Sequence, residues 1–192
     1  NANIGFLSDF CDSIIKEGIS IKWGASASIS IHMNKSIFFK LKRSGCEYLS
    51  FGIESASNKV LRDMRKNITA GIAKRNIVDC YESGISACTN WILGYFTEDE
   101  EDFEQTLRFI AENNKYINAI DTSLFTIKPH TYVYEHREEL GIYLDKNLMW
   151  STTDSKNSYE IRIKRLEKFR RLQKEIALNI NSRIGGLRKC KL

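Results

Sequence analysis

The chain has 192 residues, of which 42% are hydrophobic and 28% charged, and its formal net charge at pH 7 is +5. This composition excludes a disordered tail, and the length is sufficient to bury a core. No apolar run reaches the roughly 20 residues that cross a bilayer, and no charged and then apolar leader is visible, so the cytoplasm is the expected location.

The first half of the chain alternates helical and extended patterns. Apolar residues at helical spacing predict a helix over residues 6–16, which is followed by a strand over 19–25 and a helix over 34–43. A strand over 48–53 comes next, and a short helix begins at Ser57. Thr69 then starts another helix, which Gly84 ends.

The second half continues this alternation. A strand is predicted over residues 85–93, and a helix follows, for which Thr97 with Glu100 forms a capping box. A fourth strand covers 119–127. After a loop over 146–158, apolar residues at steps of three and four predict an amphipathic helix over 159–181 whose other face is basic.

This order predicts an α/β fold with parallel strands and right-handed crossovers. Four strand and helix units correspond to half of a TIM-like barrel, because a closed barrel of eight units takes roughly 250 residues. We expect the partial barrel to occupy residues 1–145 and a linker with the basic helix to occupy 146–192. A doubly wound open sheet is the competing fold, but the chain has no G-x-G-x-x-G after its first strand.

The spacing of the cysteines and the distribution of charge limit the kinds of functional site that we expect in this chain. The five cysteines are odd in number, lack C-x-x-C spacing and are interpreted as reduced structural thiols: Cys11, Cys46, Cys80, Cys88 and Cys190. Residues 156–192 contain twelve Lys or Arg and three Asp or Glu, so the excess positive charge belongs to the C-terminal segment.

In barrels, functional side chains lie at the carboxyl ends of the strands. The polar residues found there are Ser26 and Ser28, then Glu54 and Ser55, then residues 94–98, and finally residues 128–131. An acid directly after an apolar strand must find a partner or face a ligand.

For Glu54 the alternative to a ligand is an ordinary salt bridge with Lys59 or Lys66. Lys66, in the break between two helices, is itself a candidate to meet a carboxylate ligand. Gly52 and Gly94 stand where a ligand or another backbone can approach closely. Among the histidines only His130, beside the single proline, is a site candidate.

One stretch of the sequence resembles a known family. The run Phe51-Gly52-Ile53-Glu54-Ser55, followed by Met64-Arg65-Lys66 and Thr69, is similar to radical S-adenosylmethionine enzymes. The resemblance is strongest to the branch that often carries a cobalamin-binding domain, including anaerobic magnesium-protoporphyrin ester cyclase-like proteins. It extends over about residues 8–142, including Pro129-His130-Thr131.

The resemblance implies a reduced iron–sulfur cluster that cleaves S-adenosylmethionine, with cobalamin as a further candidate cofactor. By similarity, Glu54 and Ser55 would lie near the ribose or methionine part of S-adenosylmethionine, and Lys66 would reach its carboxylate. Ile92 and Gly94 would pack near the adenine. Ser28, which stands where the family often has arginine, and His130 are the candidate substrate contacts.

The sequence also departs from the family pattern. The C-x-x-x-C-x-x-C motif that holds the cluster is absent, and the G-x-P-G-E turn reads Gly94-Tyr95-Phe96-Thr97-Glu98. We therefore expect the chain to be the C-terminal part of such an enzyme and inactive without the missing N-terminal half. The expected partners are that half, a small-molecule substrate and a second copy bound through exposed sheet edges.

Two other functions are considered. The basic helix would suit an interaction or nucleic-acid-binding module, but only Tyr159 and Phe169 there could stack on bases, and the apolar face of the helix has to be buried, so nucleic acid is disfavoured. An ordinary barrel lyase or isomerase would need a catalytic lysine on a strand, for which Lys22 is the candidate.

Overall fold

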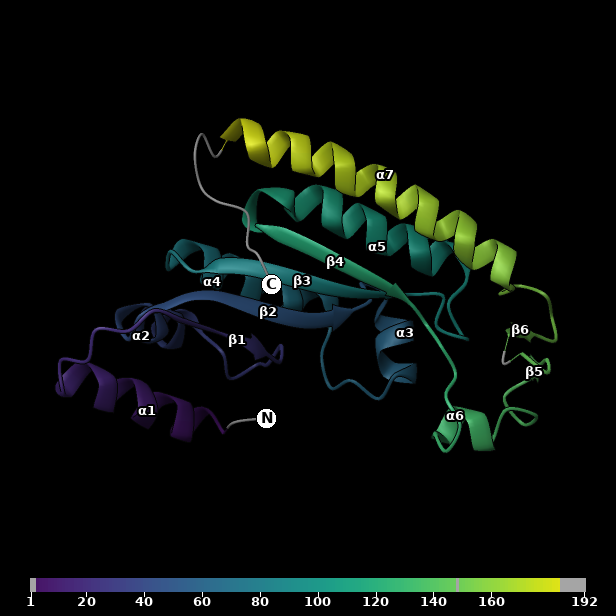
Figure 1. Cartoon of the computed structure of the whole chain (residues 1–192), viewed down its shortest axis with the longest axis horizontal. Coiled ribbons are helices and arrows are strands. Elements are labelled where there is room, and N and C mark those ends of the chain that lie inside the picture. The colour runs from purple at the N-terminus through teal and green to yellow at the C-terminus, as the bar shows by residue number, and fades with distance from the viewer. Residues whose placement is uncertain (1–2, 148, 184–192) are drawn as a thin grey trace.

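The computed structural model describes residues 3–147 and 149–183. Its centre is a four-stranded sheet in the order β1-β2-β3-β4, and all three strand pairs are parallel (Figure 1). The strands are β1 (Trp23–Ala27), β2 (Cys46–Glu54), β3 (Ser86–Leu93) and β4 (Ala119–Leu124). The predicted α/β fold with four parallel strands is confirmed.

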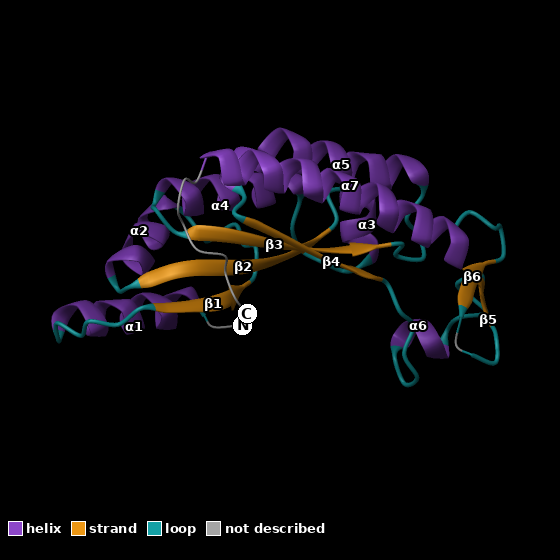
Figure 2. Ribbon diagram, turned by 45° about the horizontal axis from the view of Figure 1, so that its top comes forward, coloured by secondary structure: helices purple, strands orange, loops and turns teal. Residues whose placement is uncertain are grey.

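Helices connect the strands and cover one side of the sheet, as Figure 2 shows for α2, α4, α5 and α7. The helices of this layer are α1 (Ile4–Lys16), α2 (Lys35–Arg43), α3 (Asn58–Asp63), α4 (Ala70–Glu82), α5 (Glu100–Asn113), the 3-10 turn η1 (Asn114–Tyr116) and α7 (Tyr159–Arg183). The main core lies between this layer and the sheet, where Phe51 and Trp91 are buried. Successive side chains of a strand point to opposite faces of the sheet. The residues between the buried ones, such as Ser50 and Asn90, therefore lie on the face that the helices do not cover.

Helices α2, α3 and α4 begin where the sequence predicts, because a single polar side chain caps the start of each one. Asn34, Ser57 and Thr69 each accept a hydrogen bond from a backbone N–H in the first turn of their helices. The predicted start of α5 is wrong: the capping box is formed by Asp99 and Asp102, two residues after the expected pair. Asp102 is fixed by a second set of contacts, because Ser57 Oγ donates to its carboxylate at 2.6 Å.

Strand β1 begins four residues later than predicted. Ile19 and Ile21 look like strand residues, but their exposed fractions are 54% and 48%. The ladder starts only at Trp23, whose N–H donates to Gly45 O at 3.0 Å and whose partner is the first residue of β2. Pairing with β2 therefore sets the start of β1, whatever the propensity of the preceding residues.

A small subdomain follows β4. It contains α6 (Tyr132–Glu135) and an antiparallel hairpin of β5 (Ile142–Leu144) and β6 (Trp150–Thr152). The predicted strand over 119–127 ends at Leu124, and Ile127 instead joins Ile142 and Trp150 in a second apolar cluster. The hairpin was missed because its strands of three residues are too short to show alternation.

Helix α7 packs its apolar face on the barrel, as the amphipathic pattern predicts. Phe169 and Ile176 belong to the main core, and Gln173 Nε2 donates to Ile120 O of β4 at 3.0 Å. Two of its basic residues, Arg162 and Arg165, are buried rather than displayed on a basic face. The basic residues beyond 183, and Cys190, lie outside the described residues. Within the described ranges no helix has the length and hydropathy needed to cross a membrane.

Candidate functional site

The carboxyl end of β2 holds an ion pair in an unusual backbone geometry. Glu54 has φ +72°, in the left-handed region, directly after a register shift between Gly52 and Glu54. Its Oε1 accepts from Lys66 Nζ at 2.9 Å, and the same Nζ donates to Gly52 O at 2.7 Å. A non-glycine residue in this region costs conformational energy and is found at functional sites.

The local chain explains how Lys66 reaches this position. Helix α3 ends at Asp63 with Met64 as its C-cap, and Arg65 follows with φ +55°, which turns the backbone so that Lys66 N donates to Leu61 O. A Cβ at position 52 would stand 2.7 Å from Glu54 Oε1, so a side chain there would displace the Glu54 carboxylate from its present position. Of the two lysines considered from the sequence, Lys66 is the partner of Glu54, whereas Lys59 pairs with Asp99 and Asp102.

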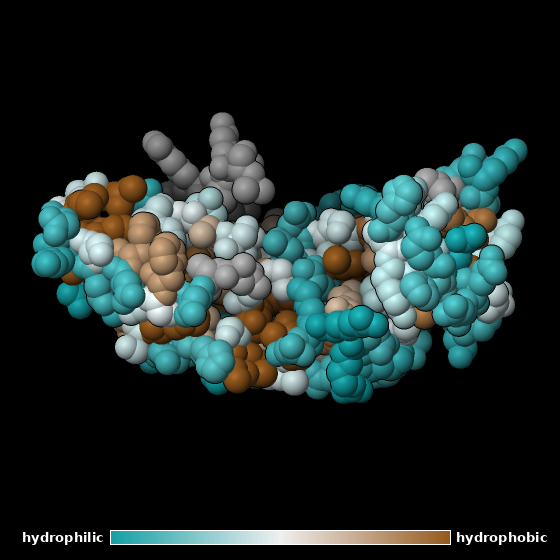
Figure 3. All heavy atoms as spheres, turned by 90° about the horizontal axis from the view of Figure 1, so that it is seen from below, coloured by the Kyte–Doolittle hydropathy of each residue, from teal (hydrophilic) through white to brown (hydrophobic). Residues whose placement is uncertain are grey.

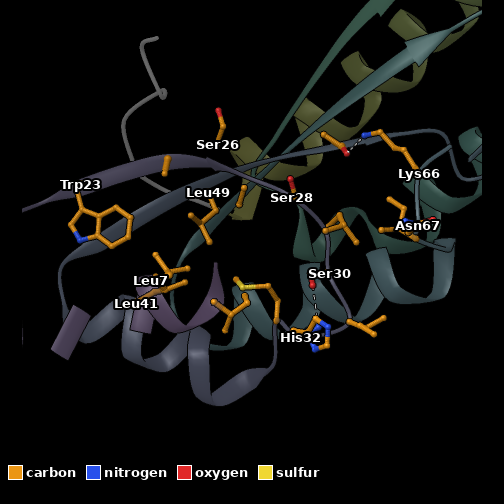
Figure 4. A pocket seen from close by; sticks show the side chains of 18 residues that line it. Leu7, Trp23, Ser26, Ser28, Ser30, His32, Leu41, Leu49, Lys66 and Asn67 are labelled. Atoms are coloured by element: carbon orange, nitrogen blue, oxygen red, sulfur yellow. Dashed lines mark hydrogen bonds between the residues drawn. The ribbon is translucent and has the colours of Figure 1, made fainter. Parts of the chain in front are cut away.

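A cavity of about 680 Å³ adjoins this ion pair. It is lined by parts of α1, β1 and the connection from β1 to α2, and by Gly52, Lys66, Asn67 and Ile68. Figure 4 shows Lys66 and Asn67 at one end and Trp23 and Leu7 at the other. Ser28 lies on its wall, and the side chains of Lys66 and Glu54 remain 31% and 19% exposed, so a ligand can reach both charges. Figure 3 views the molecule from below and shows apolar surface gathered at the end that carries α1 and near the middle.

The carboxyl end of β3 has a different construction. Gly94 follows the strand with φ +75°, and its N–H donates to Glu98 Oε2 at 2.7 Å. Burial raises the pKa of Glu98 to about 7, although the charge of Arg165 and the Gly94 hydrogen bond act in the opposite direction. Ile92 is half-buried and alternates with the buried Trp91 and Leu93.

Two predicted site residues stand apart from this group. Ser55 is completely buried, and its Oγ accepts from Ser57 N at 3.1 Å and lies 3.4 Å from Thr106 Oγ1 of α5. The side chain of His130 is 94% exposed and lies 3.9 Å from Glu135, away from the lining of the cavity. The structure therefore places Lys66 and Ser28 on one cavity, with Glu54 bonded to Lys66 beside it, whereas Ser55, Ile92, Gly94 and His130 do not line it.

Lys22 does not fit the alternative of a lyase. It precedes β1, its side chain is 82% exposed, and it pairs with Glu47 at 2.6 Å. This hydrogen bond raises the pKa of Lys22, whereas a lysine that forms a Schiff base needs a lowered pKa.

The described cysteines cannot hold an iron–sulfur cluster together. Cys11, Cys46 and Cys80 are buried, and burial raises the pKa of the Cys46 thiol to about 12, although cluster ligands are thiolates. No group of three or more His, Cys, Asp or Glu side chains within residues 3–147 and 149–183 could hold a metal ion.

The sequence analysis missed a polar layer on the open face of the sheet. Asn90 Nδ2 donates to Ser50 Oγ at 3.0 Å, and Asp121 of β4 lies beside Asn90 in register. The sequence signal for this layer was Asn90, a polar residue in β3. It stands at one of the positions that alternate with buried residues along the strand.

A parallel sheet with helices on one side is the architecture of a barrel segment, and barrels bind ligands at the carboxyl ends of their strands, where this chain has an accessible ion pair. The sequence profile of the Radical SAM superfamily matches residues 12–110, which is half of the chain. The chain belongs to the radical SAM superfamily, and the predicted family is confirmed.

Relatives and solved structures agree with this assignment. An uncharacterized methyltransferase of Pyrococcus horikoshii is 30% identical over 73% of this chain and 30% of that protein. Anaerobic magnesium-protoporphyrin IX monomethyl ester cyclase of Rubrivivax gelatinosus is 25% identical over 69% and 23%. The chain thus spans between about a quarter and a third of the length of these relatives.

The fold is also that of a solved family member. The structure of the radical S-adenosylmethionine methyltransferase TsrM from Kitasatospora setae, with cobalamin and a [4Fe-4S] cluster bound, matches with a TM-score of 0.62 at 14% identity. The match covers 74% of this chain and 30% of that one. The likeness supports the predicted partial barrel.

Proposed function

We propose that this chain forms the S-adenosylmethionine-binding wall of a radical S-adenosylmethionine enzyme. The observation that carries the proposal is the accessible pair of Glu54 and Lys66 on the rim of the cavity. The amino acid end of S-adenosylmethionine carries one carboxylate and one ammonium group. A lysine can pair with the carboxylate, and a glutamate can accept from the ammonium group or from ribose hydroxyls.

The end of β3 would hold the adenine. Ile92 offers a half-buried apolar side chain, and the buried Gly94 would contribute backbone only, because Arg162 occupies the space that a side chain at this position would take. Ser55 would enter the site only through its backbone, because its hydroxyl is bonded within the helix layer. Ser28, on the cavity wall, remains our candidate for contact with a small-molecule substrate.

The described residues fit S-adenosylmethionine but not the cluster. We infer that the cluster ligands come from a segment N-terminal to these strands in a longer protein, and that the chain alone is inactive. Support comes from the absence of a C-x-x-x-C-x-x-C motif in the sequence and from the buried thiols. With a reduced cluster held by that other segment as the electron donor, bound S-adenosylmethionine would supply the radical chemistry. What this chain contributes is binding and orientation at the strand ends.

We infer that further strands, or a second copy, would pair with β1 rather than with β4. The free edge of β4 already has Ile120 O bonded to Gln173, whereas β1 is bordered by the cavity and by exposed apolar side chains of the preceding segment. The reaction of the whole protein is proposed to be of the methyltransferase or cyclase type, as in the relatives, and cobalamin is a candidate cofactor.

Binding of S-adenosylmethionine tests the proposal directly. Equilibrium dialysis of the full-length protein should show that Lys66→Met weakens binding at least about tenfold, which corresponds to about 1.4 kcal/mol, since an ion pair to the ligand is lost. Lys22→Met removes a lysine from an exposed ion pair elsewhere and is the matched control, with unchanged affinity expected. Equal affinity of the Lys66 variant and the wild type would contradict the proposal.

The inference on the cluster has its own test. Anaerobic reconstitution of this chain with iron and sulfide should give no stoichiometric cluster absorbance, because suitably spaced thiolates are absent. A stoichiometric cluster on this chain would contradict the inference.

A further inference from the structure

The turn after β3 is held by a buried carboxylate that bonds in two directions. Glu98 Oε2 accepts from Gly94 N–H at 2.7 Å and from Arg165 Nη1 at 3.2 Å. Arg165 Nη1 also donates to Glu98 O, and the two side chains are only 1% and 3% exposed. Residues 94–98 are thus tied to α7, although α7 lies more than sixty residues further along the chain.

A second arginine of α7 packs directly behind the turn. A Cβ at Gly94 would stand 2.4 Å from Arg162 Cδ and 2.5 Å from Arg162 Cγ, so the glycine backbone rests on the arginine stem. The Arg162 guanidinium lies 3.6 Å from the centre of the Trp150 ring and donates to Trp150 O at 2.8 Å.

Asn157 completes this support. Its Oδ1 accepts from Arg162 Nη1 at 3.1 Å, and its Nδ2 donates to Tyr95 O at 2.9 Å. Arg162 and Asn157 therefore contact the backbone of two successive turn residues, Gly94 and Tyr95, from the side away from the strand.

Burying the charged Arg162 side chain behind the turn carries a large desolvation cost. Arg162 is 2% exposed, and no carboxylate forms an ion pair with it in the described part of the chain. A buried cation without an ion pair is weak evidence for a role in stability, because an apolar side chain of similar volume would avoid the desolvation cost. Its contacts instead fix backbone geometry.

We propose that Arg162 is a positioning residue for the S-adenosylmethionine site: from α7, its stem sets the position of Gly94 and thereby the surface that receives the adenine. The inference rests on the proposed function. Helix α7, which the sequence presents as a basic tail, is on this account part of the cofactor site without touching the cofactor. Small displacements of groups that position a ligand are costly, so loss of the stem should weaken binding.

The test uses the full-length protein and equilibrium dialysis with S-adenosylmethionine, at a temperature where each variant is folded by circular dichroism. Arg162→Ala should raise the dissociation constant at least about tenfold. Arg162→Lys keeps the Cγ and Cδ atoms that contact Gly94 and should raise it less than about threefold. Arg170→Ala, an exposed arginine on the same helix, is the matched control and should leave it unchanged.

Steady-state kinetics distinguish a positioning role from a general loss of structure, because only the former raises KM without changing kcat. The KM for S-adenosylmethionine should rise in Arg162→Ala while kcat at saturating S-adenosylmethionine stays constant. If Arg162→Ala does not fold, Asn157→Ala keeps the Arg162 stem but removes the donor to Tyr95 O and the acceptor for Arg162 Nη1, and it should still weaken binding about threefold. Wild-type affinity in Arg162→Ala, or in Asn157→Ala where the former is unfolded, would overturn the inference.

The two proposals fail in different ways. If the wild type binds S-adenosylmethionine and Lys66→Met weakens this binding while the Arg162 variants do not, the positioning role is wrong and the proposed function stands. If Lys66→Met leaves the affinity unchanged, the proposed function itself fails.

Discussion

The carboxyl ends of β2 and β3 lie side by side in the sheet, but they are built in opposite ways. At the end of β2, Glu54 and Lys66 form an accessible pair next to a cavity. At the end of β3, Glu98 and Arg165 form a pair that is almost completely buried. An exposed pair can exchange its partners for a ligand at low cost, whereas a buried pair cannot be separated without leaving an uncompensated charge. The first is suited to binding and the second to holding a turn in place.

The largest effect that this comparison predicts is on stability at the end of β3. Arg165→Met should lower the free energy of unfolding at pH 8 by about 3–5 kcal/mol, because it leaves the Glu98 carboxylate buried without its cation. Urea unfolding measures this, and Arg170→Met on the exposed side of α7 should stay within about 0.5 kcal/mol. Equal effects of the two substitutions would contradict the assignment of Arg165 to the buried pair.

The next effect is a dependence on pH. Because burial raises the pKa of Glu98 to about 7, the folded protein retains a proton between about pH 4.5 and 7 that the unfolded chain has released. The contribution of Glu98 to the free energy of unfolding therefore falls as pH rises through this window, by on the order of 3 kcal/mol, and then levels off. Glu98→Gln should lack this decrease. Urea titrations of both proteins at pH 5 and pH 8 measure the difference, and parallel pH profiles would contradict the prediction.

A smaller effect on stability is expected at the end of β2. Lys66→Met should change the free energy of unfolding by less than about 1 kcal/mol, since the pair is partly exposed. The same variant should lose at least about tenfold in affinity for S-adenosylmethionine. A large loss of stability with unchanged affinity would reverse the roles assigned to the two strand ends.

The smallest effect is predicted for Lys22→Ala. This lysine is exposed and pairs only with Glu47 among the described residues, so the midpoint of urea unfolding should not move. Borohydride treatment with a carbonyl substrate should give no adduct at Lys22, and trapping there would restore the lyase alternative.

Local signals predicted much of the fold. Asn34, Ser57 and Thr69 begin helices because a single side chain satisfies backbone N–H groups, and this needs no knowledge of the tertiary structure. The start of β1 and the start of α5 were misplaced because distant residues decide them. Cys46 sets the first pairing of β1, and the contact from Ser57 to Asp102 favours the later cap.

The partners of the ion pair at the end of β2 could be predicted from the sequence, but its geometry could not. Glu54 and Lys66 follow from their places after a strand and between helices, but the left-handed backbone of Glu54 has no signature in the sequence. Arg162 and Arg165 were counted with the basic face of a helix, since their burial depends on Trp150 and Glu98, which lie elsewhere in the chain. The Ser55 hydroxyl turned inward for the same kind of reason, because Thr106 of α5 lies beside it.

One contact of α7 has a consequence for assembly. A strand edge with free backbone groups serves as a template, and a sheet with two such edges can grow without limit. Gln173 donates to Ile120 O, so a side-chain amide already occupies one acceptor on the outer edge of β4. We therefore expect a further strand of a longer protein, or a second copy, to pair with β1 rather than with β4.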